Sequence, residues 1–300
     1  MLSLADLAAL HSAYASEASL PVAPALLGDV RVGDGGPAIM GTVNLSRDST
    51  YRESVAVSTH SAIRKARVQM AQGASIVDVG AESSTARAAR VGPDDQIARL
   101  VPVITEIAVE TVVSVETYEP QVVEACLKSG AQVLNMTGRE HEAEMLDLAA
   151  EHEAAVILCF VEHANVREST RLDLDTDPIP VLADHFERRL ELARRAGVDH
   201  VVIDPGMGFF YDNLTDPMTR ARHQTRVLAN AFRLRTLGVP ICNALPHAFD
   251  LFEEEFRTAE GFFAVLAVLG GSHLLRTHEV AHVRAVLASM AALSLQPDQP

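Results

Sequence analysis

The sequence predicts an α/β protein that folds as a (β/α)8 TIM barrel with a short N-terminal helix and hairpin extension. From residue 38 onward, eight short apolar segments alternate with longer helical patterns, which favours parallel strands joined by right-handed crossovers. Three apolar segments end in polar groups, at Asn44, at Asp78 with Glu82, and at Asp204. Polar groups at strand ends are how a parallel barrel builds an active site on one rim.

The expected elements follow from periodicity and stop signals. Residues 58–72, 120–129 and 183–196 have helical periodicity, and each is followed by a glycine, a common helix stop. No GxGxxG motif follows the first strand and no GxxxxGK(S/T) loop occurs, so nucleotide-binding folds lack their phosphate loops. The eight expected strands are 38–43, 75–79, 111–115, 131–135, 154–159, 200–203, 239–243 and 272–276.

The pattern also predicts how the chain is divided. Residues 1–37 form an N-terminal unit, with an amphipathic helix over 4–17 and a hairpin or cap over 26–32. Residues 38–294 form the barrel, and 295–300 form a disordered tail. Long irregular segments at 45–57, 83–93 and 161–180 follow strands, so we expect them on the catalytic rim as lids or substrate contacts.

Composition narrows the possible partners and location. The chain has 300 residues, 48% of them hydrophobic, which is enough for a large core. Lys and Arg number 25 against 40 Asp and Glu, a net charge of −15, which argues against nucleic acid or an anionic membrane as a partner. Three scattered cysteines without a CxxC pair indicate a reducing cytoplasm. Neither a signal peptide nor an apolar run of membrane-spanning length is evident.

The order and the residue types of the strand ends resemble those of the dihydropteroate synthase family of pterin-binding barrels, over about residues 39–282. The most specific matches are the segments 40–44, 78–83, 204–206 and 276–278. The resemblance implies that a dihydropterin enters the barrel mouth and that its pyrophosphate leaves when p-aminobenzoate attacks. It also implies a homodimer and a magnesium ion.

The resemblance assigns roles to individual residues. Asn44 would help to hold the pyrophosphate and its Mg²⁺, and Arg276 and His278 would grip the pyrophosphate as the leaving group. Asn135 would contact the pterin. Asp204 would accept hydrogen bonds from the ring NH and the amino group, since a carboxylate offers two acceptors to two adjacent donors. Further substrate contacts are expected from Glu116, Met207, Phe209 and Ser84.

The chain departs from the family pattern at several chemical positions. Glu116 stands where the family has aspartate, and Met136 where it has a second carboxylate. The Ser-Arg-Lys motif of the seventh strand reads Pro246-His247-Ala248, so the lysine that contacts the pterin is absent. His247 is therefore a candidate for proton transfer or hydrogen bonding. Arg47 and Arg87 are candidates for new substrate contacts.

Each assignment has a structural alternative. Asp78 lies within a strand, where a buried carboxylate needs partners, so a structural network is expected there. Arg276 could pair with a rim carboxylate, His247 could be a packed loop histidine, and His278 could cap the last helix. His278 and His282 lie four residues apart, but two histidines without a third ligand do not indicate zinc.

Three functions fit these residues. The first is a dihydropteroate-synthase-like transferase that joins a pterin, possibly as its pyrophosphate ester, to an amine acceptor, and that diverges from ordinary folate synthesis. The second is a tetrahydrofolate-dependent methyl or one-carbon transferase on the same barrel. The third is a non-catalytic paralogue that binds a pterin.

Overall fold

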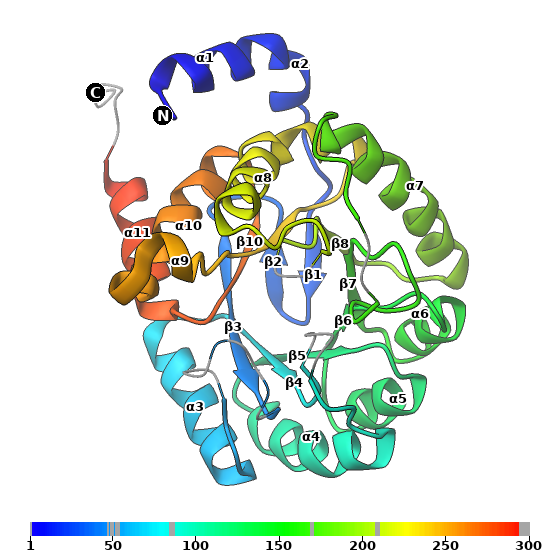
Figure 1. The fold of residues 1–300 in the computed structure, drawn as a ribbon. Helices are drawn as coiled ribbons and strands as arrows, with labels where there is room; N and C mark the ends of the chain where they lie inside the picture. Colours follow the sequence, from blue (N-terminus) through cyan, green and yellow to red (C-terminus); the bar gives the residue numbers. More distant parts are fainter. Residues whose placement is uncertain are drawn as a thin grey trace, which may run out of the picture.

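A computed structural model shows eight parallel strands that form a barrel surrounded by helices (Figure 1). It describes residues 2–46, 48, 51, 55–83, 88–168, 171–207 and 211–293. The strand order is β8-β7-β6-β5-β4-β3-β10-β9, and a parallel bridge between Ile203 and Ile241 joins the two ends of the sheet. The strands are β3 (Ala38–Asn44), β4 (Ile76–Gly80), β5 (Val112–Thr117), β6 (Val133–Met136), β7 (Ala155–Cys159), β8 (Val201–Asp204), β9 (Cys242–Ala244) and β10 (Leu274–Thr277).

The eight predicted strands are confirmed, with small differences at their ends. The largest difference is at β9, which begins at Cys242 rather than at residue 239. Pro240 lies just before this strand and has no N–H to donate to a neighbour, although its carbonyl accepts from Ile203 N–H (3.1 Å). The (β/α)8 barrel fold predicted from the alternation of segments is therefore present.

The helices that follow the strands cover the outside of the barrel (Figure 1). The predicted stops at Gly73 and Gly197 are confirmed, since both glycines adopt left-handed conformations (φ 111° and 87°). The helices around the barrel are α3 (Thr59–Gln72), α4 (Pro93–Ile107), α5 (Pro120–Lys128), α6 (Glu142–Glu151), α7 (Pro178–Ala196), α8 (Pro217–Asn230), η2 (Ala231–Leu237), α9 (Phe249–Phe252), η3 (Glu253–Thr258), α10 (Ala259–Leu269) and α11 (Val280–Ala292).

The start of α7 differs from the prediction. The helix begins at Pro178, five residues before the expected start, within the segment predicted to be irregular. Asp177 caps it by accepting a hydrogen bond from Ile179 N–H (3.1 Å). A proline at the first helical position has no N–H to leave unsatisfied, so Pro178 begins this helix rather than breaking it.

The N-terminal extension contains two short helices and a hairpin. The predicted amphipathic helix over 4–17 is wrong in detail: α1 (Leu4–Ala13) and α2 (Ala15–Ala18) are separate, and neither has a buried residue. The predicted hairpin is present as β1 (Ala25–Leu27) and β2 (Val30–Val32), which pair antiparallel. No helix of the described residues is long and apolar enough to cross a membrane.

The hairpin packs against the barrel strands. Its Ala25, Leu27 and Val32 belong to one core cluster with residues near the strand starts, among them Met40, Ile76, Val112, Val133 and Ala155. This packing covers the N-terminal end of the barrel and leaves the polar strand ends at the opposite rim. The parallel register aligns those ends, pairing Asn44 with Gly80, Gly80 with Glu116, Glu116 with Asn135, and Cys159 with Asp204.

Candidate functional site

An arginine lies among carboxylates at the floor of the rim. Arg276 on β10 donates from Nε to Asp78 on β4 (2.8 Å) and from Nη2 to Glu116 on β5. The structure thus shows the pairing with rim carboxylates that the sequence left open for Arg276. Two of its three guanidinium nitrogens are engaged in these contacts, and such charge-assisted bonds are among the strongest in proteins.

Asp78 is the buried centre of this network. One of its oxygens accepts from Ser114 Oγ (2.6 Å), and the other accepts from Arg276 and from Asn135 Nδ2 (3.2 Å). Only 1% of Asp78 is exposed, so both oxygens are supplied by protein donors. The contacts match the structural role predicted for this carboxylate. Asn135 in turn accepts from Cys159 Sγ (3.1 Å), which orients its amide.

Two further carboxylates of the floor are electrostatically unfavourable in their ionised form. Burial raises the pKa of Asp204 to about 6, against the hydrogen bond from Gly206 N–H and the charge of Arg276. Burial also raises the pKa of Glu116, and the charges of Asp78 and Asp204 raise it further, while Arg276 opposes them. The floor therefore has more carboxylate than cation, which suits a ligand that brings N–H donors.

Asn44 is the last residue of β3, and Met207 lies just after β8. Asn44 is in register with Gly80 of β4. If Gly80 carried a Cβ atom, that atom would lie 3.7 Å from Asn44 Oδ1 and 3.6 Å from the Glu116 side chain. Met207 is buried, and its carbonyl accepts from Gln224 Nε2 (2.8 Å). The predicted contacts Ser84 and Phe209, and the candidates Arg47 and Arg87, lie outside the described residues.

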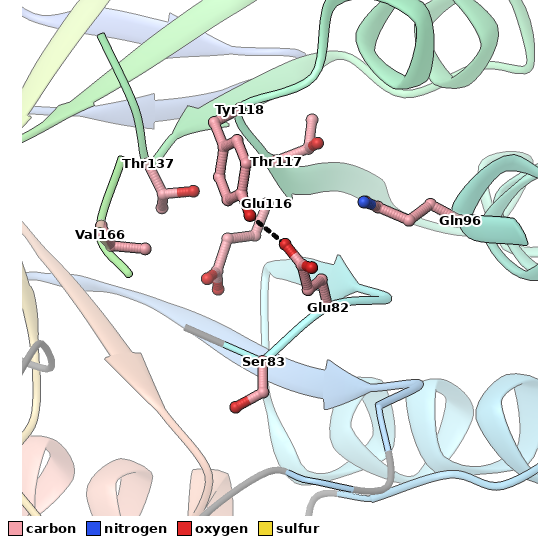
Figure 2. A pocket seen from close by; sticks show the side chains of 8 residues that line it. All are labelled: Glu82, Ser83, Gln96, Glu116, Thr117, Tyr118, Thr137 and Val166. Carbon is pink, nitrogen blue, oxygen red and sulfur yellow. Dashed lines mark hydrogen bonds between the residues drawn. The ribbon is translucent and has the colours of Figure 1, made fainter. Parts of the chain in front are cut away.

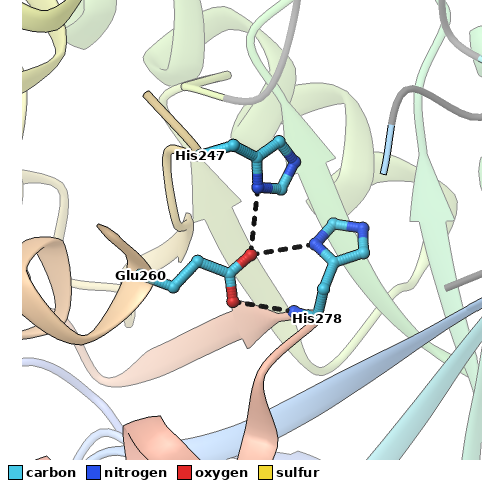
Figure 3. A group of neighbouring side chains, drawn as sticks. All are labelled: His247, Glu260 and His278. Carbon is cyan, nitrogen blue, oxygen red and sulfur yellow. Dashed lines mark hydrogen bonds and ion pairs between the residues drawn. The ribbon is translucent and has the colours of Figure 1, made fainter. Parts of the chain in front are cut away.

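A second cluster joins two predicted histidines through a carboxylate that the sequence analysis missed. Glu260, in the first turn of α10, places Oε1 3.0 Å from His278 Nδ1 and 3.1 Å from His247 Nδ1 (Figure 3). Its Oε2 accepts from the backbone N–H groups of His278 (2.9 Å) and Glu279 (3.0 Å) and from the Thr277 hydroxyl. The sequence feature that could have identified Glu260 is its place as the lone acidic residue at the start of the apolar segment 259–269.

Tyr51 holds the two imidazole rings from one side. Its ring stacks on His278 (centroids 4.6 Å apart, 28° between planes) and lies 4.7 Å from the ring of His247. The Tyr51 hydroxyl donates to Glu279 (2.5 Å). A residue from the segment after β3 thereby fixes side chains that follow β9 and β10, a contact that no local pattern indicates.

Protonation states in this cluster follow from its geometry. Burial opposes ionisation of Glu260, but the contacts with His247 and His278 hold its pKa well below the usual range. Burial lowers the pKa of His278 to about 4, and the charges of His247 and Arg276 contribute, against the hydrogen bond to Glu260. An ionised carboxylate can only accept, so His278 is neutral near pH 7 with its proton on Nδ1.

Glu82 contacts several segments of the rim, and Figure 2 shows its hydrogen bond with Tyr118. It accepts from the Tyr118 hydroxyl and from Val91 N–H (2.9 Å), and it lies 3.6 Å from Arg167. Arg167 also donates to the Ser83 carbonyl (2.8 Å). The adjacent pocket of about 10 Å³ has room for roughly one water molecule. Glu82 is thus engaged in positioning loops.

Comparison with known proteins places the chain in a family. Residues 40–278 match the family described as pterin binding enzyme. The chain belongs to this family. Dihydropteroate synthase of Bacillus subtilis (strain 168) is 29% identical over 267 residues, which cover 85% of this chain and 88% of that protein. Dihydropteroate synthase of Escherichia coli (strain K12) is 26% identical over 272 residues, or 85% and 93% of the two chains.

Solved structures share the fold of this chain. Xanthomonas albilineans dihydropteroate synthase with 4-aminobenzoic acid has a TM-score of 0.76 and 24% identity, covering 92% of this chain and 100% of that one. Burkholderia cenocepacia dihydropteroate synthase complexed with 7,8-dihydropteroate has a TM-score of 0.75 and 23% identity, covering 91% and 96%. The chain therefore has the same barrel fold as these two proteins.

After the seventh strand, β9, the chain lacks a cation where the family resemblance places lysine. Ala248 occupies that position in a left-handed conformation (φ 43°) immediately before α9. Its methyl group carries no charge. Beside it, His247 is the titratable side chain that reaches the cluster of Glu260 and His278.

A cavity of about 210 Å³ opens beside β8, between the segments after β7 and β8 and the helices α7 and α8. Pro205 and Met207, which follow Asp204 in the chain, line it together with Phe160, Tyr211 and His223. The lining combines aromatic and apolar side chains with a few polar groups, which is typical of sites for small organic molecules.

Proposed function

We propose that this protein is a dihydropteroate-synthase-like transferase that binds a dihydropterin and joins it to an amine acceptor. The observation that carries this proposal is the buried carboxylate of Asp204 at the end of β8. Burial raises the pKa of this carboxylate to about 6. A pterin edge offers a ring NH and an amino group side by side, and two such donors would stabilise the ionised carboxylate.

The relatives support the same substrate class. One solved relative holds 4-aminobenzoic acid and another holds 7,8-dihydropteroate. In the proposed reaction, the pterin methylene carbon loses pyrophosphate and forms a bond to the amine nitrogen, which releases a proton. The cavity lined in part by Phe160, Met207 and Tyr211 is the proposed space for the acceptor.

The leaving-group side of the proposal involves Asn44, Arg276 and His278. Within the described residues, Arg276 has only Nη1 without a carboxylate partner, and His278 is neutral near pH 7. The fixed positive charge available to a pyrophosphate is therefore small. The predicted grip needs a further cation, and this protein is proposed to diverge from ordinary folate synthesis in how it supplies that charge.

A magnesium ion fits this proposal only as a companion of the pyrophosphate. Asn44 offers a single neutral amide oxygen as a ligand. Mg²⁺ commonly takes few protein ligands and completes its shell with phosphate oxygens and water. Asn44 would hold such an ion, which would neutralise charge on the leaving group.

The proposal also includes a cytoplasmic homodimer. Phe262 and Leu269 on α10 are 46% and 55% exposed, and exposed apolar side chains on one helix can form such a contact. Equilibrium sedimentation of the protein and of Phe262→Glu tests this part independently of the chemistry.

Calorimetry with separate ligands tests the main proposal. A dihydropterin pyrophosphate should bind, Asp204→Asn should weaken its binding by about tenfold or more through loss of charge-assisted hydrogen bonds, and pyrophosphate release should depend on p-aminobenzoate or another amine. Binding of a reduced folate alone would instead support the one-carbon transferase. Pterin binding without consumption of any amine would support the non-catalytic paralogue, and failure of every pterin to bind contradicts all three.

A further inference from the structure

We infer that His247, Glu260 and His278 form a binding site for one divalent transition-metal ion of the zinc class. The ligand atoms of these three residues all lie within 4.8 Å of one another (Figure 3). Two imidazole nitrogens and one carboxylate oxygen are the donor set of open zinc sites, in which the remaining position is left to water or substrate.

The carboxylate is held as a metal ligand should be. Three donors fix Oε2 of Glu260, namely two backbone N–H groups and the Thr277 hydroxyl, so that Oε1 faces the two histidines. Tyr51 packs against both imidazole rings and restricts their rotation. Ligands held in this way by a second set of contacts lose little freedom when an ion binds.

The buried carboxylate of the cluster has no lysine or arginine within ion-pair distance among the described residues. Glu260 is fully buried, and within the described part of the chain its only ion-pair partners are the imidazoles of His247 and His278. Arg276 is committed to Asp78 and Glu116. A buried charge needs a partner of opposite charge, which a divalent ion would supply.

His247 adds an independent observation. Its Nδ1 is buried and lies 3.1 Å from Glu260 Oε1, yet it makes no hydrogen bond within the described structure. The two atoms therefore lie within ion-pair distance of each other. A metal ion between the nitrogen and the oxygen would satisfy this ring nitrogen, and the 23% exposure of the His247 side chain leaves a path for the ion to enter.

Metal binding would also change what the histidines offer to a ligand. The second ring nitrogen of each histidine points away from Glu260 (Figure 3). When Nδ1 binds a metal, the proton of a neutral imidazole resides on Nε2. Both rings would then present N–H donors beside a net positive charge, as a pyrophosphate requires. This consequence rests on the proposed function, whereas the metal site does not.

Titration of chelator-treated full-length protein with Co²⁺ tests the site in the absence of any pterin. We expect one ion per chain, visible absorption bands of low-coordinate Co²⁺, and displacement by Zn²⁺. Glu260→Gln and His247→Ala should each weaken binding by at least about 100-fold. Because His247 lies at a partly exposed loop, the second variant keeps the test valid if the first fails to fold, as thermal melting will show.

His282→Ala is the matched control. His282 lies on α11, its side chain is 49% exposed, and its Nδ1 is 3.6 Å from Glu279 rather than from Glu260. Its removal should leave Co²⁺ affinity within about threefold of the wild type, a change below 1 kcal/mol. Absence of stoichiometric Co²⁺ binding, equal affinity in Glu260→Gln, or loss of binding only in His282→Ala would each overturn the inference.

A second titration with inorganic pyrophosphate separates the metal from protons as the source of charge. Zn²⁺-loaded protein should bind pyrophosphate at least about tenfold more tightly than chelator-treated protein, a difference of about 1.4 kcal/mol. Equal affinity accompanied by proton uptake, seen as a heat that depends on the buffer, would contradict the metal as the charge carrier. Failure of the pterin experiments alone would leave the Co²⁺ result intact.

Discussion

The floor around Arg276 and the cluster around Glu260 solve the same electrostatic problem differently. In the floor, a permanently charged guanidinium lies between Asp78 and Glu116. In the cluster, an equally buried carboxylate faces two imidazoles, of which His278 is neutral near pH 7. The floor thus places a permanent cation beside Asp78 and Glu116, whereas the cation that we propose for the cluster comes from solution.

Replacing the arginine of the floor should have the largest effect. Arg276→Met leaves Asp78 and Glu116 buried without their cation, and breaking a buried pair in this way costs about 3–5 kcal/mol. Urea unfolding should show this loss of stability. Arg194→Met is a suitable control, since Arg194 pairs with Glu191 on an exposed surface and its loss should change little. A small effect in Arg276→Met would mean that the floor carboxylates are not charged.

The two regions should respond to pH in opposite directions. Burial raises the pKa of Asp204 in the folded protein to about 6 from its ordinary value of 3.8, so its contribution to stability is present below about pH 4 and is lost as pH rises through 6. The difference corresponds to about 3 kcal/mol. Urea unfolding of wild type and Asp204→Asn between pH 4 and 7 should show this slope in the wild type only. Parallel curves for the two proteins would contradict the raised pKa.

For the cluster around Glu260, stability changes with pH in the opposite direction. The pKa of Glu260 is lowered, so its stabilisation is present above its ordinary value and is lost as pH falls. The pKa of His278 is lowered to about 4 from 6.5. The folded protein therefore also loses stability as pH falls from about 6.5 to 4. Glu260→Gln should cost about 1–3 kcal/mol at pH 7, where it removes a charged acceptor, and less at pH 4. A variant effect that grows at low pH would contradict this reading.

The loop network of Glu82 should give the smallest effect. Tyr118→Phe removes the hydroxyl that donates to Glu82 but leaves Val91 N–H and Arg167 beside that carboxylate. We expect a loss of about 1 kcal/mol in the free energy of unfolding and unchanged Co²⁺ affinity. A large loss of metal binding in this variant would mean that the cluster and the loops are coupled.

The barrel was predictable because its signals are local. Apolar runs of strand length, helical periodicity and glycine stops such as Gly73 and Gly197 report backbone preferences within a few residues. The same locality explains the errors: Pro178 begins α7, although a proline in sequence commonly marks a loop. The segment 4–17 has apolar residues at helical spacing but no buried face.

The sequence by itself determined which strand ends carry polar groups, because side chains at the carboxyl ends of parallel strands share one rim. Only the tertiary structure decided their partners. Arg276 contacts Asp78 and Glu116 across 198 and 160 residues, and Glu260 contacts His247 and His278 although its place as the lone acidic residue of an apolar helix does not indicate which residues it contacts. Such pairings depend on barrel closure and on burial, which set charge and pKa through distances that sequence spacing does not contain.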